Sequence, residues 1–206
     1  MILVSKGAGM DYSCVLAEIA KEYGGVIETR IASERGISKA TLSNLCKNNM
    51  LIRIARGQYT LPDELEDELL AISMRSGNII FSHETALFLH GISDSTPFVH
   101  AITAPSNCIP SPLIKSACKV YYIKSELFSI GKTTLQTYAG NYVPGYDLER
   151  TICDIVRSRS RIGTETFTTA LKLYSSRKDK DLNKLSAYAD LFHVQNILRP
   201  YLEMML

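Results

Sequence analysis

SKATLSNLCKNNMLIRIARGQYTLP, at residues 38–62, is the stretch that decides the fold of the N-terminal part of the chain. Its first half predicts a helix at residues 39–49, with Ser38 as the N-cap. At about 100° per residue, three apolar side chains gather on one side of this helix, namely Leu42, Leu45 and Cys46. That side is expected to face a small core.

The second half of the stretch predicts a hairpin. Residues 51–54 are typical of a strand, residues 55–58 of a tight turn, and residues 59–61 of the returning strand, which Pro62 ends. The predicted helix and the predicted hairpin are therefore consecutive.

Two shorter helices are expected upstream. Apolar residues at i, i+4 and i+8 predict one at about residues 14–23, with Asp11 or Ser13 as its cap. A second is expected at about residues 29–35, ended by Gly36. Three helices followed by a hairpin predict a winged helix-turn-helix over residues 10–61.

Charge along the chain is distributed unevenly. The net charge is +2, yet the segment from Arg35 to Thr60 holds five basic residues and no acidic one, and five acidic residues follow directly. The basic residues are Arg35, Lys39, Lys47, Arg53 and Arg56, and the acidic ones are Asp63, Glu64, Glu66, Asp67 and Glu68. A local basic surplus on a predicted winged helix indicates contact with DNA.

The outer side of the third helix carries short polar side chains and lysines instead of alternating Glu and Lys. Such side chains reach base edges and phosphates in a major groove. The expected DNA-binding residues are Ser38, Lys39, Ala40, Thr41, Ser43, Asn44 and Lys47 from the helix, and Arg53, Arg56 and Gln58 from the hairpin. The alternative is a winged helix that contacts another protein.

The rest of the chain predicts a linker and a second domain. Residues 62–77 are expected to form a linker helix whose early acidic residues complement the helix dipole. Residues 78–206 mix both element types, so the fold class is α+β, a winged helix-turn-helix followed by a mixed α/β C-terminal domain. Strands are expected at residues 79–81, 99–103, 120–123 and 142–143, and helices at 83–90, 148–159, 165–174, 182–192 and 195–206. Ser82 and Asp147 are expected caps, and Pro200 is expected to interrupt the last helix.

Several protein classes are excluded by composition. No apolar run approaches the roughly 18 residues of a membrane span, so no membrane partner is expected. Five scattered cysteines without a C-x-x-C pair fit a reducing cytosol. Residues 1–9 are expected to be disordered or a non-native start. His83 and His90 lack the spacing of a metal site and no phosphate loop is present, so we expect no metal, no cofactor and no enzyme activity.

Three stretches together carry a family resemblance: FSHETALFLHG at residues 81–91, YDLERTICD at 146–154 and RGQYTLP at 56–62. In order and spacing, residues 11–206 resemble the AbiEi family of antitoxins from type IV toxin-antitoxin (abortive infection) systems. The resemblance implies a cytoplasmic autorepressor whose winged helix binds inverted repeats in its own promoter. It also implies a C-terminal domain that counteracts a nucleotidyltransferase toxin, without requiring a stable complex.

Charged residues at one predicted helix form the expected antitoxin surface: Asp147, Glu149, Arg150, Asp154, Arg157, Arg159 and Arg161. An N-cap with an ion-pair network is the structural alternative, and a kinase-like enzyme that modifies the toxin by way of metal-bound carboxylates is another. A toxin-holding module without DNA binding is a third. Because no heptad pattern is present, we expect monomers that bind adjacent half-sites cooperatively.

Overall fold

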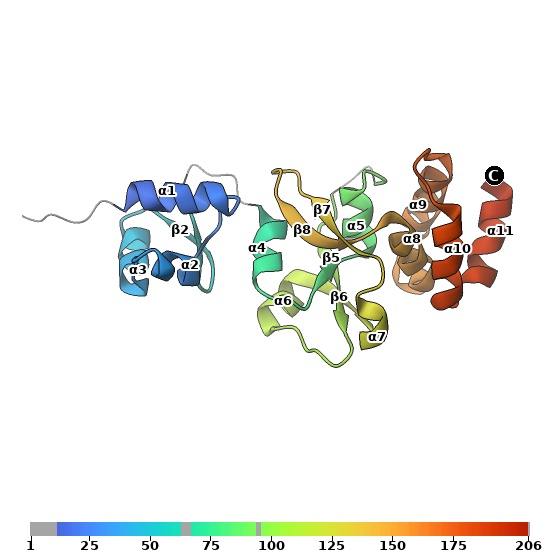
Figure 1. The fold of residues 1–206 in the computed structure, drawn as a ribbon, viewed down its shortest axis with the longest axis horizontal. Helices are drawn as coiled ribbons and strands as arrows, with labels where there is room; N and C mark the ends of the chain where they lie inside the picture. The colour runs from blue at the N-terminus through green and yellow to red at the C-terminus, as the bar shows by residue number, and fades with distance from the viewer. Residues whose placement is uncertain (1–11, 63–66, 94–95, 206) are drawn as a thin grey trace, which may run out of the picture. The chain divides into compact units, whose positions relative to one another are not determined.

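The computed structural model describes residues 12–62, 67–93 and 96–205 (Figure 1). The chain is of mixed α+β class, with two sheets. It divides into two units, residues 1–71 and 72–206, each described below by itself. No helix in the described ranges combines the length and apolar character needed to cross a bilayer. The expected disorder of residues 1–9 falls outside the described part.

The N-terminal unit holds three helices and a small antiparallel sheet. The elements, in chain order, are α1 Ser13–Glu22, β1 Ile27–Glu28, α2 Thr29–Glu34, α3 Lys39–Lys47, β2 Ile52–Ala55 and β3 Gln58–Thr60. Strand β3 lies between β1 and β2. The three predicted helices and the hairpin are confirmed. Strand β1 was missed because two residues are too few to show an alternating pattern.

Local signals place the ends of these helices. The Ser38 hydroxyl accepts a hydrogen bond from the Thr41 N–H at 3.1 Å, which confirms the predicted cap of α3. Gly36, with φ +82°, lies between α2 and α3, as expected of a residue that ends a helix. The α1 prediction was wrong in one detail, because the N-cap is Tyr12 and Ser13 is already helical. The other proposed cap, Asp11, lies outside the described residues.

The core of this unit is built from one face of each helix. Its buried apolar residues include Leu16, Ile19, Ala20, Val26, Ile27, Ile31, Ala32, Ile37, Leu42, Leu51 and Tyr59. Leu45 and Cys46, predicted to face inward with Leu42, are only half-buried. The opposite side of α3 is left to solvent.

Helix α4 Glu68–Met74 follows. A linker helix was expected at residues 62–77, and residues 63–66 of that prediction lie outside the described part. The Asp67 carboxylate accepts a hydrogen bond from the Leu70 N–H at 3.1 Å, the pattern of an N-cap. The division between the two units falls within α4, between Ala71 and Ile72.

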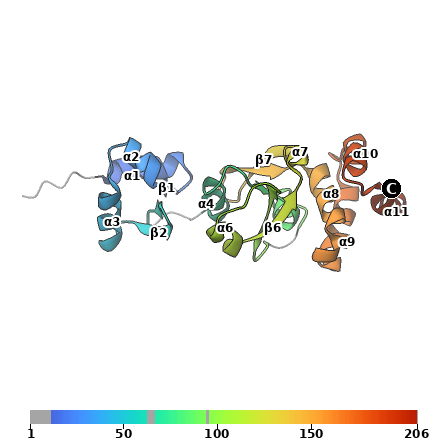
Figure 2. The same cartoon turned by 90° about the horizontal axis from the view of Figure 1, so that it is seen from below.

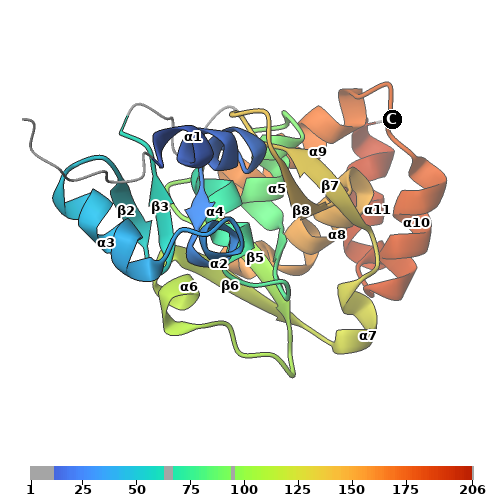
Figure 3. The same cartoon turned by 60° about the vertical axis from the view of Figure 1, so that its left-hand side comes forward.

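The C-terminal unit contains a five-stranded mixed sheet, of which β5, β6, β7 and β8 are labelled in Figure 3. They are β4 Ile80–Phe81, β5 His100–Pro105, β6 Cys118–Ile123, β7 Lys132–Gln136 and β8 Tyr142–Tyr146, in the order β6-β5-β4-β8-β7. The β5–β6 and β4–β8 pairs are parallel, and the other two are antiparallel. Strand β7 was not predicted, because this edge strand has a single buried apolar residue, Leu135.

Helices cover this sheet and extend beyond it (Figure 2). They are α5 His83–Leu89, α6 Pro112–Ala117, α7 Ser125–Phe128, α8 Leu148–Arg157, the 3₁₀ helix η1 Arg159–Arg161, α9 Thr164–Ser176, α10 Leu182–Leu191 and α11 Gln195–Met205. The five predicted helices are present, and α6, α7 and η1 were missed because they are too short to show periodicity. The predicted interruption at Pro200 was wrong, since α11 runs through it.

Helix α8 is the centre of the C-terminal core. Every residue from Leu148 to Val156 is buried. Its apolar side chains pack with those of α9 and α10, including Phe167, Leu171 and Leu185. A helix buried on all sides has to accommodate its polar residues internally, and the charged residues of α8 are therefore the notable feature of this unit.

Gly131 provides a test of the packing around α8. Its φ is +72°, and a Cβ there would lie 2.6 Å from Arg150 Cβ. Gly91 has a similar φ of +68° with open space around it. We expect Gly131→Ala to lower the free energy of unfolding by about 1–3 kcal/mol more than Gly91→Ala, since both strain the backbone but only the first overpacks. Urea unfolding measures both, and equal losses would contradict the described contact.

Candidate functional site

The exposed face of α3 carries most of the predicted DNA-binding residues. Five of them are exposed together on this helix: Lys39, Ala40, Ser43, Asn44 and Lys47. Ser38 is exposed at the N-cap, where its hydroxyl also lies 2.9 Å from that of Thr41, which is half-buried. The face is a surface of small polar groups between two lysines.

The β2–β3 hairpin adds two further cations. Arg53 and Arg56 are both exposed. Arg53 Nε donates to the Ala55 carbonyl at 3.3 Å, across an irregularity in the β2–β3 register. Gly57, with φ +80°, makes the turn beside Arg56. The hairpin thus holds both guanidinium groups in solvent.

Charge compensation separates these cations from Arg30 and Arg35. Arg30 pairs with Glu34 at 2.8 Å, and Arg35 pairs with Glu22, which raises the pKa of the Arg35 guanidinium. Within the described ranges, no carboxylate pairs with any cation of α3 or the hairpin, namely Lys39, Lys47, Arg53 and Arg56. Among the described cations of this unit, the four of α3 and the hairpin thus form a group without carboxylate partners; the other one is Lys21, on α1.

Gln58 was wrongly predicted as a DNA contact. Its side chain is only 3% exposed, and its Nε2 donates to the Ala71 carbonyl at 3.2 Å. The cause is that β3 is the central strand of its sheet and all three of its residues are buried. Conversely, Met50 and Ile52 are exposed at the start of β2. They were not predicted among the surface residues of the hairpin, because apolar residues in or beside a strand suggest a core position.

In the C-terminal unit, Arg150 and Asp154 are not on a surface, which corrects the prediction. Both side chains are fully buried, and Arg150 Nε donates to Asp154 Oδ2 at 3.0 Å. The Arg150 guanidinium also donates to the carbonyls of Leu127 (3.1 Å) and Ile130 (2.7 Å). Burial raises the pKa of Asp154, against the opposing effect of the Arg150 and Arg157 guanidiniums.

Glu149 and Asp147 are likewise engaged in the fold. Glu149 is 5% exposed, and its Oε1 accepts from the Asp181 N–H at 3.0 Å. Asp147 caps α8 by accepting from the Arg150 N–H at 2.8 Å, and it pairs with Lys184 at 2.9 Å. The geometry therefore supports the N-cap and ion-pair network for these residues.

The remaining part of the predicted antitoxin surface does reach solvent. Arg157 is half-buried and pairs with Asp154 at 3.1 Å, whereas Arg159 and Arg161 are exposed. In the part of the chain that the structure describes, no three His, Cys, Asp or Glu side chains are placed to hold a metal ion. The predicted surface is thus reduced to its arginines.

His83 occupies a strained and fully buried position, with φ +48°. Its ring lies 2.9 Å from Ser82 Oγ and 3.0 Å from Ser158 Oγ, and it stacks on Tyr121 at 3.4 Å. Ser82 is the N-cap residue of α5, but its hydroxyl serves His83 and Thr103 instead of capping. Burial lowers the pKa of His83 well below its ordinary value, and nearby cations lower it further.

His90, at the other end of α5, has a partner of its own. Its Nε2 lies 2.8 Å from the Tyr146 carbonyl. Burial lowers the pKa of His90 as well. The two histidines of the FSHETALFLHG stretch therefore have different partners: two serine hydroxyls for His83 and a main-chain carbonyl for His90.

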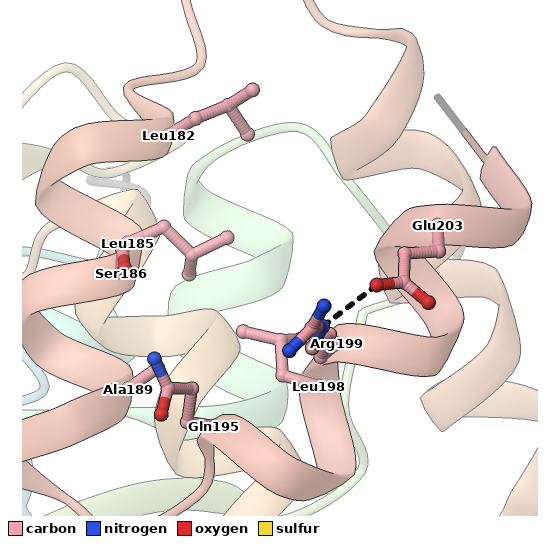
Figure 4. Close-up of a pocket in the computed structure, with 8 residues that line it drawn as sticks. All are labelled: Leu182, Leu185, Ser186, Ala189, Gln195, Leu198, Arg199 and Glu203. Atoms are coloured by element: carbon pink, nitrogen blue, oxygen red, sulfur yellow. Dashed lines mark hydrogen bonds and ion pairs between the residues drawn. The ribbon is translucent and has the colours of Figure 1, made fainter.

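A hollow of about 270 Å³ lies between α10 and α11 (Figure 4). Leucine side chains form much of its lining, and an Arg199–Glu203 ion pair of 2.7 Å lies at one side. Its lining residues are Leu182, Leu185, Ser186, Ala189, Gln195, Leu198, Arg199 and Glu203. Among the described lining residues, no nucleophile is paired with a base.

The neutral His83 ring gives the C-terminal unit a pH-dependent stability. In an unfolded chain a histidine titrates near pH 6.5. Below that pH the unfolded chain binds a proton that the folded unit excludes, so stability is fully present above it and is lost as pH falls, by up to about 1.4 kcal/mol per unit. We expect His83→Asn, which tolerates the left-handed φ, to reduce this slope in urea unfolding at pH 5, 6 and 7.

His90→Gln is the matched variant for this measurement, because the lowered pKa of His90 contributes with the same sign. The slope of His83→Asn should be smaller than that of His90→Gln, since His83 is the more deeply buried of the two. A slope equal to that of the unchanged protein would contradict the neutral state of His83.

Comparisons with known proteins bear on the fold. No model of a known protein family matches the chain, and no curated protein matches it. Among solved structures, the protein Rv2827c from Mycobacterium tuberculosis is similar, with a TM-score of 0.68 and 12% sequence identity. The alignment covers 94% of this chain and 76% of that one. At this identity, the likeness shows a shared fold alone.

Proposed function

We propose that the N-terminal unit is a winged helix-turn-helix that binds double-stranded DNA. The observation that carries this proposal is the group of four exposed cations on α3 and the hairpin that no described carboxylate pairs, whereas Arg30 and Arg35 are paired with carboxylates. Phosphate contacts supply most of the affinity of such a surface. In this arrangement α3 lies in the major groove and the β2–β3 hairpin is the wing.

The individual side chains have different roles in the complex. Asn44 and Ser43 hydrogen-bond base edges, and Ala40 packs on a thymine methyl group. Lys39 and Lys47, at the two ends of α3, contact phosphates or guanine. Arg53 and Arg56 hold the backbone or reach the minor groove from the wing. Ser38 and Thr41 fix the start of the helix, since their hydroxyls bond each other and the backbone.

The biological role follows from the sequence resemblance to the AbiEi antitoxins. The protein is a cytoplasmic antitoxin that represses its own operon at promoter inverted repeats and counteracts a nucleotidyltransferase toxin through its C-terminal unit. Monomers occupy adjacent half-sites cooperatively. The uncompensated charge of α3 and the hairpin favours this role over that of a toxin-holding module without DNA binding.

Two substitutions separate backbone contact from base recognition. Arg56→Ala should weaken binding to all sequences together and lower the salt slope by about one counterion, since it removes a phosphate contact. Asn44→Ala should weaken binding to the preferred promoter by about 1–3 kcal/mol and leave the affinity for other sequences nearly unchanged. Fluorescence anisotropy over a salt series measures both effects.

Arg30→Ala is the matched control, because this exposed arginine is paired with Glu34 on α2. It should leave both affinities unchanged. Equal binding of promoter and unrelated DNA by the intact protein would contradict the proposed operator recognition.

The antitoxin role predicts that repression and rescue are separable. In the full chain, Lys47→Glu with Arg56→Glu should abolish promoter repression, because both side chains would repel phosphates. The same double variant should still restore the growth of cells that express the cognate toxin. A reporter assay and a growth assay on one strain measure the two, and loss of rescue with intact folding would contradict the assignment to the C-terminal unit.

A further inference from the structure

We propose that Arg157-Ser-Arg-Ser-Arg161, together with Lys119, forms a second binding site, for a phosphate-bearing ligand, on the C-terminal unit. The ligand is a single-stranded oligonucleotide or a free nucleotide, which present the same phosphate chemistry. This site is separate from the proposed DNA-binding face of α3. In this site the exposed arginines of the C-terminal unit bind the phosphate groups of the ligand.

Positive charge at this place exceeds its compensation. Asp154 pairs with both Arg150 and Arg157, and Glu84 pairs with Lys119 at 2.8 Å. In the described part of the chain, no carboxylate pairs with Arg159 or Arg161. The charges of these two exposed guanidiniums, two residues apart on one 3₁₀ turn, are therefore uncompensated, although Arg161 Nη2 also donates to the Val120 carbonyl at 3.5 Å.

Arg161 is held in position before any ligand binds. Its guanidinium lies 4.3 Å from the centroid of the Tyr121 ring, and the His83 ring stacks on Tyr121 at 3.4 Å. One face of a phenol ring has no room for both the guanidinium and the imidazole. The Arg161 guanidinium and the His83 ring therefore lie on opposite faces of Tyr121. The main-chain carbonyl of Arg161 also accepts from Lys119 Nζ at 3.0 Å. A preorganised arginine loses less side-chain entropy on binding.

The neutral state of His83 agrees with a site of this kind. Its ring nitrogens are occupied by Ser82 and Ser158, and the cations near it are Arg157, Lys119, Arg150 and Arg161. Two carboxylates of the neighbouring segments, Glu84 and Asp154, are both paired with cations. A protonated ring would add to the cationic surplus, whereas a phosphate would reduce it.

The donor pattern favours phosphate over an acidic protein surface. Arginine forks bind phosphate oxygens in pairs, and the exposed Ser160 hydroxyl between Arg159 and Arg161 can donate to a third oxygen. A carboxylate has only two oxygens and needs no such third donor. A compact, alternating set of arginines and serines is thus better matched to phosphate.

The test uses the full chain carrying Lys47→Glu and Arg56→Glu, so that the proposed α3 surface does not contribute. The probes are a fluorescein-labelled 12-nucleotide single-stranded RNA, with ATP and a 12-residue poly-glutamate peptide as competitors. Arg159→Glu with Arg161→Glu should weaken RNA binding at least tenfold and reduce the salt slope by about 1.4, for two lost contacts. Lys172→Glu with Lys178→Glu, the same charge change at exposed positions, should leave it unchanged.

Arg161→Lys distinguishes a built site from diffuse charge. It keeps the charge but loses the planar fork over Tyr121, so we expect RNA binding to weaken severalfold. Competition by ATP assigns the site to free nucleotides, and RNA binding that ATP does not displace assigns it to oligonucleotides; both support the proposal. Equal loss in the two double-glutamate variants, unchanged binding by Arg161→Lys, or equal competition by poly-glutamate would overturn it. Near-UV circular dichroism confirms that each variant is folded.

Discussion

A desolvated guanidinium, that of Arg150, is the constraint on which the C-terminal unit depends. Removing a charge from water is costly unless every direction around it offers compensation. Arg150 is compensated by Asp154 on its own helix, by the carbonyls of Leu127 and Ile130 on a neighbouring segment, and by two aromatic faces, although its Nη2 has no hydrogen-bond partner among the described residues. The Tyr146 and Phe192 rings lie 4.0 and 4.1 Å from its central carbon. One side chain thereby joins α7, β8, α8 and α10.

The surrounding segments are adapted to that guanidinium. Gly131 lies so close to the Arg150 side chain that a Cβ would not fit. Asp147 caps α8 at the same end and also receives a hydrogen bond from Tyr188 at 3.1 Å. The charged residues of α8 thus hold helices together from within. Because Glu149, Arg150 and Asp154 are buried, they are poorly suited to contact a partner.

Charge compensation distinguishes the cations with a structural role from those available for binding. Arg30, Arg35, Arg150 and Arg177 are paired with carboxylates of the fold. The cations of α3, of the β2–β3 hairpin and of η1 have no such described partners. A net charge of +2 conceals this difference, since it averages paired and unpaired groups. Both proposed binding surfaces are places where positive charge is left without a carboxylate.

The sequence by itself determined what depends on neighbours along the chain. The periodicity of α1, α3 and α8, the caps at Ser38 and Asp147, and the hairpin could be predicted, because each is decided within a few residues. The localisation of positive charge to α3 and the hairpin could be predicted for the same reason. It rests on composition over a short segment.

Only the tertiary structure decided which of these polar residues face solvent. Gln58 is buried because β3 became the central strand, and Glu149, Arg150 and Asp154 are buried because α8 is surrounded on all sides. Likewise, His83 and Tyr121 meet although they are far apart in the sequence. Such outcomes depend on contacts between distant segments, and a local pattern of charge is the same whether its helix is buried or exposed. The sequence could therefore place charges on helices, but the packing of those helices decided which charges are left to bind a ligand.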